Sequence, residues 1–225
     1  HCDQGLGKKE ILHWIHKDLT EIKYTYAHFE SQSNQIANVL KILDIHAGDI
    51  VSIFLPRSTT LVSSFFGILK LQAMSCILFS TLGEDALLDR LGNSQTKILI
   101  TKNSLARKVI AIKDKLPDLK TILVVDIDEH KNEFVLSLTK LMENANSDFE
   151  YSPQLDSETP AFLQYTSGST GKPKGALHVH GAIQDIIQSF TEIIDVEEED
   201  LYWCTADPAW ITGLSYGIIA PLSTM

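Results

Sequence analysis

Three features of the sequence predict an α/β fold with a mainly parallel sheet flanked by helices. Short apolar runs alternate along the chain with amphipathic stretches of helical periodicity. The runs are nearly continuous in apolar character, which is typical of strands that are covered on both faces. The stretches between them are long enough for right-handed helical crossovers between parallel strands.

The predicted strands are short apolar segments, and most of them are rich in β-branched residues. Two of them flank a polar loop late in the chain. The predicted strands are 49–55, 76–79, 97–101, 121–126, 162–166 and 175–181.

Helices are predicted where apolar residues recur three or four positions apart. This spacing occurs at 36–43, at 105–116 and, most regularly, at 183–194. Ser104 is placed to cap the second helix, and Pro117 follows its end. We interpret the apolar faces as surfaces that pack on the sheet rather than as binding faces for a partner.

The composition argues against two kinds of partner. The net charge of −10 argues against a nucleic acid held through its phosphates. The most apolar region, 61–79, is interrupted by Lys70 and Gln72. A membrane-spanning helix needs about 20 apolar residues without such interruptions, so no membrane partner is predicted.

The cysteines indicate a reducing compartment. Cys2, Cys76 and Cys204 are odd in number and widely spaced, and no C-x-x-C pair occurs. A cytoplasmic location is therefore predicted.

A loop rich in glycine, hydroxyl and lysine residues follows the predicted strand at 162–166. Its sequence is TSGSTGKPKG, residues 166–175. In open α/β sheets, ligands bind at the carboxyl ends of the strands. Glycines let the backbone approach a ligand closely, and successive backbone N–H groups can surround an anion. With two lysines in the same loop, the natural ligand is a polyphosphate.

A P-loop of the G-x-x-x-x-G-K-[S/T] type does not fit this segment. Gly168 precedes Gly171 by only three positions, and Pro173 stands where the metal-binding hydroxyl should be. A predicted strand follows the loop, whereas a P-loop leads into a helix. These differences make a phosphotransferase the weakest alternative. A plain solvent loop is also disfavoured, because the strand context matches a ligand-binding loop.

A second distinctive block, DLYWCTADPAWITG, spans residues 200–213. Asp207 and Pro208 are suited to be the N-cap and first residue of a helix. The aromatic residues Tyr202, Trp203 and Trp210 could fill the core. A capped helix could equally present Trp210 to a pocket.

These blocks resemble those of the acyl-adenylate-forming (AMP-binding) superfamily, which includes acyl-CoA synthetases, luciferases and peptide-synthetase adenylation domains. The segment YTSGSTGKPKG matches its phosphate-loop signature. The 200–213 block resembles the "YWCTAD…GW.TG" segment of acetyl-CoA synthetases and short-chain relatives. The segment GDIVSIFLPRS, 48–58, is similar to the family's early strand and turn. The chain thus resembles an acetyl-CoA synthetase-like acid:CoA ligase.

The resemblance implies a reaction and its cofactors. A short-chain carboxylate such as acetate would react with ATP to give an acyl-adenylate and pyrophosphate, and the acyl group would then pass to coenzyme A. ATP, Mg²⁺ and coenzyme A are the implied cofactors of the full-length protein. The protein would contribute by positioning the reactants and by neutralising the negative charge that develops while pyrophosphate departs.

The resemblance also implies roles for particular residues. Lys174 would be catalytic and would help to hold pyrophosphate. Trp210 would shorten the acyl pocket and favour an acid of two or three carbons. The phosphates would be held by Thr166, Ser167, Gly168, Ser169, Thr170, Gly171, Lys172 and Gly175, and the acyl pocket would be lined by Trp210, Ile211, Thr212 and His180.

The sequence departs from the family pattern at three positions, and no metal site is predicted. Ala209 stands where acetyl-CoA synthetases usually have glycine, and Gln72 and Ile77 replace a usual glycine and proline. His178 and His180 share one face of the predicted strand, but no third ligand follows at a suitable spacing. The acidic run at 195–200 is interpreted as a solvated connection.

The predicted organisation is an incomplete N-terminal AMP-binding domain. It has a first α/β block at 1–150 and a phosphate-loop block at 151–225, joined through a polar connection at 143–160. The family's adenine, ribose and metal segments and its C-terminal domain would lie beyond residue 225. We therefore expect an active parent enzyme and an inactive fragment. A non-catalytic nucleotide-binding product and an adenylating enzyme for medium-chain or aryl acids remain alternatives.

Overall fold

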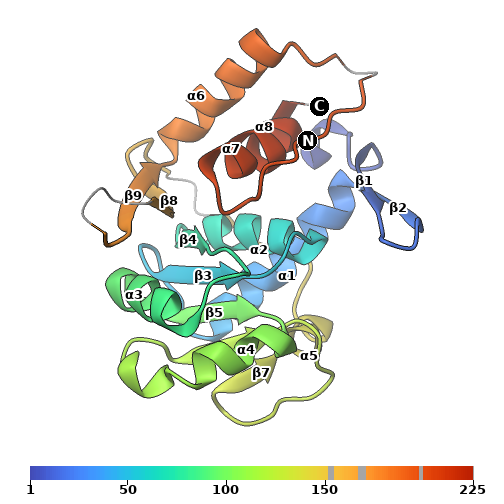
Figure 1. Ribbon diagram of the computed structural model, residues 1–225. Coiled ribbons are helices and arrows are strands. Elements are labelled where there is room, and N and C mark those ends of the chain that lie inside the picture. Colours follow the sequence, from blue (N-terminus) through green and yellow to red (C-terminus); the bar gives the residue numbers. More distant parts are fainter. Residues whose placement is uncertain (152–154, 167–170, 198–199, 225) are drawn as a thin grey trace.

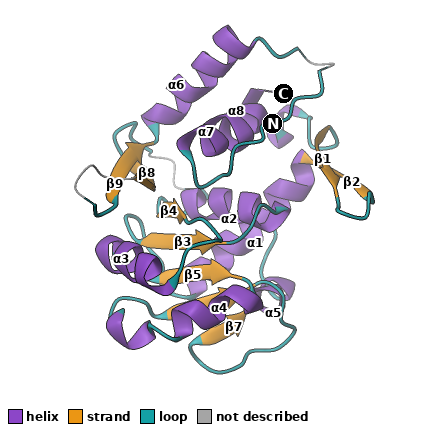
Figure 2. Ribbon diagram, viewed as in Figure 1, coloured by secondary structure: helices purple, strands orange, loops and turns teal. Residues whose placement is uncertain are grey.

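The computed structural model describes residues 1–151, 155–166, 171–197 and 200–224. A seven-stranded sheet forms the centre of the molecule, and a separate two-stranded hairpin lies near the N-terminus. Helices cover both faces of the large sheet (Figures 1 and 2). The predicted α/β fold with a mainly parallel sheet is confirmed.

The strand order of the large sheet is β7-β6-β5-β3-β4-β8-β9. All neighbours are parallel except β8 and β9, which are antiparallel. The carboxyl ends of β3, β4 and β8 therefore meet at one edge of the sheet. The bounds are β3 (Ile50–Phe54), β4 (Met74–Ile77), β5 (Ile98–Thr101), β6 (Thr121–Val124), β7 (Val135–Ser137), β8 (Pro160–Thr166) and β9 (Lys174–Val179).

The predicted strands form, with bounds that differ from the prediction by one or two residues at most of their ends. The strand predicted at 76–79 begins two residues earlier, because Met74 already donates its backbone N–H to the Asp49 carbonyl. The strand predicted at 175–181 ends at Val179, since the chain turns into a helix after His180. The short strand β7 was not predicted from the sequence.

The helices alternate with the strands, as the sequence predicts. Hydroxyl side chains cap three of them: Thr25 accepts from His28 N–H in α1, Ser58 from Leu61 N–H in α2 and Ser137 from Lys140 N–H in α5. The helices are α1 (Tyr26–Ile42), α2 (Thr59–Lys70), α3 (Glu84–Ser94), α4 (Asn103–Ile110), α5 (Leu138–Glu143), α6 (Gly181–Ser189), α7 (Ile211–Leu214) and α8 (Ala220–Thr224), with π-helical turns at Phe190–Ile194 and Ser215–Ile219.

The predicted helix at 105–116 is shorter than expected, and Ser104 does not cap it. The carboxylate of Asp126 accepts from Asn103 N–H at 2.5 Å, and the helix begins there. The helix ends at Ile110. Ile112 and Leu116 are nevertheless buried, because a turn and a short 3-10 helix at Lys113–Lys115 continue the packing.

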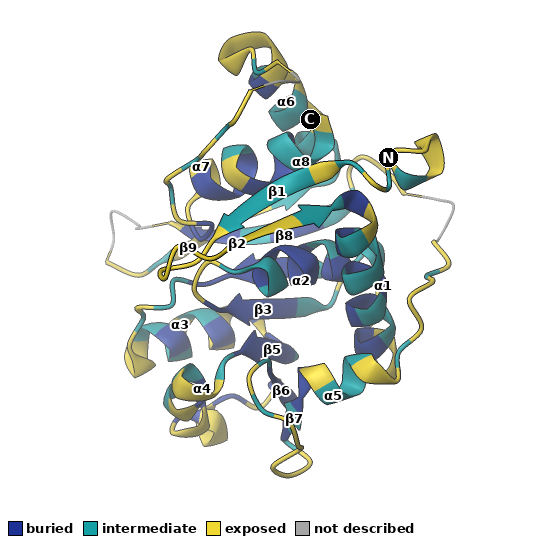
Figure 3. Cartoon of the chain, turned by 90° about the vertical axis from the view of Figure 1, so that its right-hand side faces the viewer, coloured by how far each residue is buried: buried dark blue, intermediate teal, exposed yellow. Residues whose placement is uncertain are grey.

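Successive residues of a strand point to opposite faces of the sheet, so the strands contribute side chains to two hydrophobic clusters, one on each face. Ile53 and Phe162 belong to the cluster that includes residues of α1, α2 and α7. Phe54 and Tyr165 belong to the cluster under α3 and α4. Figure 3 shows buried β3 and β5 between these two layers of helices.

Amide side chains of α1 hold the predicted connection in place. Asn34, Gln35 and Asn38 all donate to backbone carbonyls between residues 142 and 148, over distances of 2.7–3.5 Å. The chain then returns as β8, which pairs with β4 in the same sheet. The hairpin of β1 (Glu10–Ile15) and β2 (Glu21–Thr25) packs beside the start of α1.

Candidate functional site

The antiparallel strands β8 and β9 hold the two ends of the predicted phosphate loop together. Thr166 is paired with Lys174, and Tyr165 with Gly175. Thr166, Lys172 and Lys174 are all exposed. Four predicted phosphate-binding residues lie outside the described part of the chain: Ser167, Gly168, Ser169 and Thr170.

The two described loop glycines are required for different reasons. Gly171 has a φ of 88°, a left-handed conformation that favours glycine. Gly175 packs against β8, where an added Cβ would lie 2.9 Å from Leu163 Cδ1. Strand alternation places this contact on the sheet face opposite to Thr166 and Lys174. Phosphate binding by Gly175 stays a prediction, and it would use the backbone.

The 200–213 block contains a turn, and its helix begins after this turn rather than at Pro208. The carboxylate of Asp207 accepts from Ala209 N–H, and its carbonyl accepts from Trp210 N–H, both at 2.9 Å. Trp210 itself is extended, with a ψ of 147°, so α7 begins at Ile211. The prediction that Asp207 caps a helix is therefore wrong, because its side chain caps this turn.

Gly213 makes this turn possible. An added Cβ at Gly213 would overlap with the backbone carbonyl of Asp207. The turn thus folds back tightly against the first residues of α7, and Ala209 inside it is only 3% exposed.

Two of the three aromatic residues in this block lie largely at the surface. Trp203 is 78% exposed and Trp210 is 54% exposed, so neither fills the core. Tyr202 contacts Phe190 edge-on, with ring centroids 5.1 Å apart. Trp210 contacts Phe79, which follows the carboxyl end of β4, at 5.3 Å. The indole therefore lies at the same sheet edge as the phosphate loop.

The remaining predicted acyl-pocket residues have distinct environments. Ile211 and Thr212 are exposed on the first turn of α7. His180 lies beyond the end of β9, so it does not extend that strand with His178. Burial lowers the pKa of both histidines. The Nε2 atom of His180 is buried and makes no hydrogen bond within the described residues.

The side chain of His178 makes an aromatic contact. Its ring stacks on Phe162 with centroids 4.6 Å apart.

Within the described ranges, no three His, Cys, Asp or Glu side chains gather as a metal site. None of the helices described combines the length and hydropathy needed to cross a bilayer.

Two residues that bind the turn were missed by sequence reasoning. The side chain of Gln164 in β8 donates to the Ala209 carbonyl at 2.6 Å. Arg57, just after β3, donates to the Thr205 and Ala206 carbonyls at 2.9 and 2.6 Å. A polar residue inside the apolar strand FLQYT was the available signal for Gln164.

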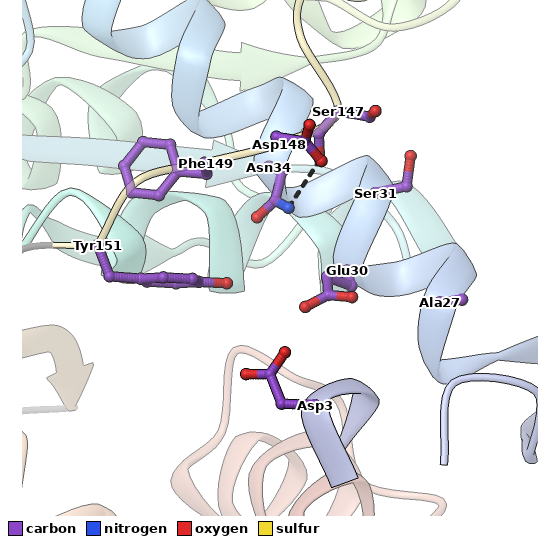
Figure 4. A pocket seen from close by; sticks show the side chains of 9 residues that line it. All are labelled: Asp3, Ala27, Glu30, Ser31, Asn34, Ser147, Asp148, Phe149 and Tyr151. Atoms are coloured by element: carbon purple, nitrogen blue, oxygen red, sulfur yellow. Dashed lines mark hydrogen bonds between the residues drawn. The ribbon is translucent and has the colours of Figure 1, made fainter. Parts of the chain in front are cut away.

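A pocket of about 390 Å³ lies elsewhere, and none of the predicted site residues lines it. Figure 4 shows the side chains of Asp3, Glu30 and Tyr151 around it. Lys70 lies nearby, and its ammonium group is 5.6 Å from the centre of the Tyr151 ring. The pocket is lined by Asp3, Ala27, Glu30, Ser31, Asn34, Ser147, Asp148, Phe149 and Tyr151.

The profile of the AMP-binding enzymes matches residues 4–224. The chain belongs to the AMP-binding enzyme family. It is 39% identical to acetyl-coenzyme A synthetase of Bacillus subtilis (strain 168) over an alignment of 202 positions that covers 88% of this chain and 34% of that protein. It is 34% identical to acetyl-coenzyme A synthetase of Deinococcus radiodurans over an alignment of 236 positions, gaps included, that covers 99% of this chain and 36% of that protein.

Solved structures of this AMP-binding family share the fold. An anthranilate CoA ligase, AuaEII, in complex with anthranoyl-AMP has a TM-score of 0.87 and 26% identity, covering 97% of this chain and 41% of that chain. An acyl-CoA synthetase of Brucella canis has a TM-score of 0.88 and 24% identity, covering 98% and 40%. The chain thus spans about a third of the length of the curated relatives that it matches.

Proposed function

We propose that the protein, in its full encoded length, is an acid:CoA ligase similar to acetyl-CoA synthetase. It activates a short-chain carboxylate with ATP to an acyl-adenylate and passes the acyl group to coenzyme A. The observation that carries this proposal is the pairing of Thr166 with Lys174 at the mouth of the phosphate loop, at the same sheet edge as Trp210. The names of the most similar relatives support it.

In the first step, a carboxylate oxygen attacks the α-phosphorus of ATP. A new O–P bond forms, the bond from that phosphorus to the bridging oxygen breaks, and its electron pair leaves with pyrophosphate. Negative charge therefore accumulates on the departing group. Lys172 and Lys174 are exposed beside the loop and form no ion pair in the described part of the chain. Their ammonium groups would neutralise this charge.

In the second step, the thiol of coenzyme A attacks the acyl carbon of the adenylate. The new thioester bond forms as AMP leaves, and the thiol proton is lost. Mg²⁺ is expected with ATP, but the described residues gather no set of ligands for it. No metal-dependent step and no contact with coenzyme A is assigned to this part of the chain.

The acyl pocket is proposed to be lined by Trp210, Ile211, Thr212 and His180. The indole of Trp210 is the largest of these side chains, so it would limit the length of the acid. His180 would take part as a neutral imidazole, because burial lowers its pKa. Acetate and propionate are therefore the proposed substrates.

A medium-chain or aryl acid is the second candidate. The structural neighbour with bound anthranoyl-AMP supports it. We also propose a cytoplasmic location, which is supported by the absence of disulfides among Cys2, Cys76 and Cys204.

Pyrophosphate exchange into ATP tests the proposal. We expect the full-length protein to support exchange with acetate or propionate better than with butyrate or benzoate, and the 225-residue chain alone to support none. Lys174→Ala should lower kcat/KM for ATP about 100-fold, because a group that neutralises developing charge is worth that order of magnitude. Lys172→Ala should have a smaller effect.

The matched control is Lys41→Ala, which removes an exposed lysine at the end of α1. If Lys174→Ala behaves like this control, Lys174 has no catalytic role. If no carboxylate supports exchange, the ligase proposal is wrong. Preferential exchange with benzoate would favour the second candidate.

A further inference from the structure

Tyr165 lies directly before the predicted phosphate loop, and its side chain is buried. The residue is 7% exposed and belongs to the hydrophobic cluster under α3 and α4. The next residue is Thr166, where the predicted loop begins. Its partner across the strand pair is Gly175, where the predicted loop ends. Tyr165 is therefore adjacent to both ends of the loop.

The ring of Tyr165 also packs close to the backbone of β9. A Cβ atom added at Gly175 would lie 3.5 Å from Tyr165 Cε1 and 2.9 Å from Leu163 Cδ1. The glycine leaves room for these two side chains of β8. A shift of the Tyr165 ring would therefore disturb both strands that lead to the loop.

The hydroxyl of Tyr165 connects this ring to α3. It donates to Asn93 Oδ1 at 2.7 Å, and the carbonyl oxygen of Arg90 lies 3.1 Å away. The guanidinium group of Arg90 lies over the ring, 5.8 Å from its centre. Burial raises the pKa of the phenol to about 12, so the hydroxyl keeps its proton and remains a donor at neutral pH.

The hydroxyl is not needed to fill the core. A phenylalanine would keep the buried ring and would bury no polar group that requires a partner. The hydroxyl instead adds a directional bond from the end of β8 to the last turn of α3. This helix is itself fixed in the core, because Leu87 and Leu91 are buried in the same cluster.

We propose that Tyr165 is a positioning residue for ATP, because its bond to Asn93 ties both ends of the phosphate loop to α3 and so holds the loop ready to bind the phosphates. This inference rests on the proposed function. Without the bond, part of the binding free energy of ATP would be lost in ordering the ends of the loop. One hydrogen bond is worth up to about tenfold in an equilibrium constant.

The test compares Tyr165→Phe with Tyr216→Phe in the full-length protein. Both substitutions remove a phenol hydroxyl and keep the ring. Tyr216 is the control, because its hydroxyl bonds to Ser189 Oγ at 3.0 Å, away from the loop. We expect Tyr165→Phe to raise KM for ATP about tenfold, with kcat and KM for acetate within about twofold of wild type. Tyr216→Phe should leave all three unchanged. A loss of folded protein would instead lower kcat and leave both KM values unchanged.

Asn93→Ala tests whether the effect passes through this bond. The substitution removes the acceptor at an exposed position of α3, and it should also raise KM for ATP. In the double variant, KM should be no higher than in Tyr165→Phe alone, since both substitutions break the same bond. A wild-type KM in Asn93→Ala, or two effects that add, would overturn the proposal.

ATP binding without turnover gives a second measurement. The dissociation constant, measured by calorimetry without acid, should rise about tenfold in Tyr165→Phe and stay within about twofold in Tyr216→Phe. Unchanged affinity in Tyr165→Phe, or an equal change in both variants, overturns the positioning role. If ATP is bound but no carboxylate is activated, the proposed function fails, while these constants still decide the role of Tyr165. A wild type that binds no ATP overturns both.

Discussion

At the scale of single residues, one position where the sequence departs from the resembled family pattern adopts a backbone conformation that favours glycine. Gln72 replaces a usual glycine, yet it adopts a left-handed φ of 57°. Its carbonyl accepts from Gly48 N–H at 2.9 Å, which joins the end of α2 to the start of β3. The backbone strain of this left-handed conformation therefore falls on a non-glycine residue.

Lys70 offers a residue-scale prediction about pH. Its ammonium group donates to Ser33 Oγ at 2.7 Å and Asn34 Oδ1 at 2.5 Å, and burial lowers its pKa to about 8. Glu30 and Cys2 lie near enough to oppose this shift in part. The unfolded chain, with an ordinary lysine pKa near 10.5, binds more protons than the folded chain above pH 8. Stability should therefore rise with pH above 8, by at most about 1.4 kcal/mol per pH unit.

The measurement is the urea midpoint between pH 8 and 9 for wild type, Lys70→Met and the exposed control Lys41→Met. This window avoids the opposite effect of Cys76. Burial raises the pKa of its thiol to about 12, so its contribution to stability is lost as pH rises above the ordinary value of 9.0. Lys70→Met should lack the rise that the other two proteins show. Parallel curves for all three would contradict the prediction.

At the scale of elements, the turn before α7 is held both by side chains from other strands and by residues of its own block. Gln164 in β8 and Arg57 after β3 bind its carbonyls. Asp207 caps it from within, and Gly213 lets α7 approach. The turn is therefore held to the carboxyl edge of the sheet at several points, at the same edge where β8 enters the predicted phosphate loop.

Gly213→Ala should be strongly destabilising. The added methyl group would overlap with the Asp207 carbonyl, and backbone cannot move aside as a flexible side chain can. We expect the free energy of unfolding to fall by about 3 kcal/mol. The control is Gly92→Ala in α3, where the Cβ would meet Leu116 Cδ2 at an ordinary 3.8 Å. That substitution should raise the free energy of unfolding by about 0.5–1 kcal/mol. Chemical denaturation measures both, and equal effects would contradict this account of the turn.

At the scale of the whole molecule, the sheet connects the two blocks predicted at 1–150 and 151–225. β8 pairs with β4, so residues from both blocks share one sheet. Phe162 of the later block packs on Phe65 of α2, with ring centroids 6.1 Å apart. The strand β8 that leads into the predicted phosphate loop is thus packed on the core formed by the earlier block.

This arrangement predicts a single unfolding transition. In a variant that keeps only Trp210, urea unfolding followed by fluorescence reports on the later block. Far-UV circular dichroism reports on all helices and strands. The two curves should coincide, because a shared sheet makes unfolding cooperative. Two separate transitions would instead support a boundary near residue 150.

The sequence by itself determined the types of most elements and predicted a phosphate loop between two of the strands. Strand and helix periodicities, and the Gly, Ser, Thr and Lys composition of 166–175, depend on neighbouring residues and can be recognised locally. For the 200–213 block it placed the helix start at Pro208, whereas the helix begins at Ile211, and it left Trp203 and Trp210 in a possible core, whereas both are exposed.

Only the tertiary structure decided how these parts meet. The pairing of β8 with β4, the bond from Gln164 to Ala209 and the bonds from Arg57 to Thr205 and Ala206 join residues that are far apart in the sequence. Such contacts depend on the order of the strands and on which face each helix covers. Local periodicity does not specify either, because the same pattern of apolar residues can be buried against several different neighbours.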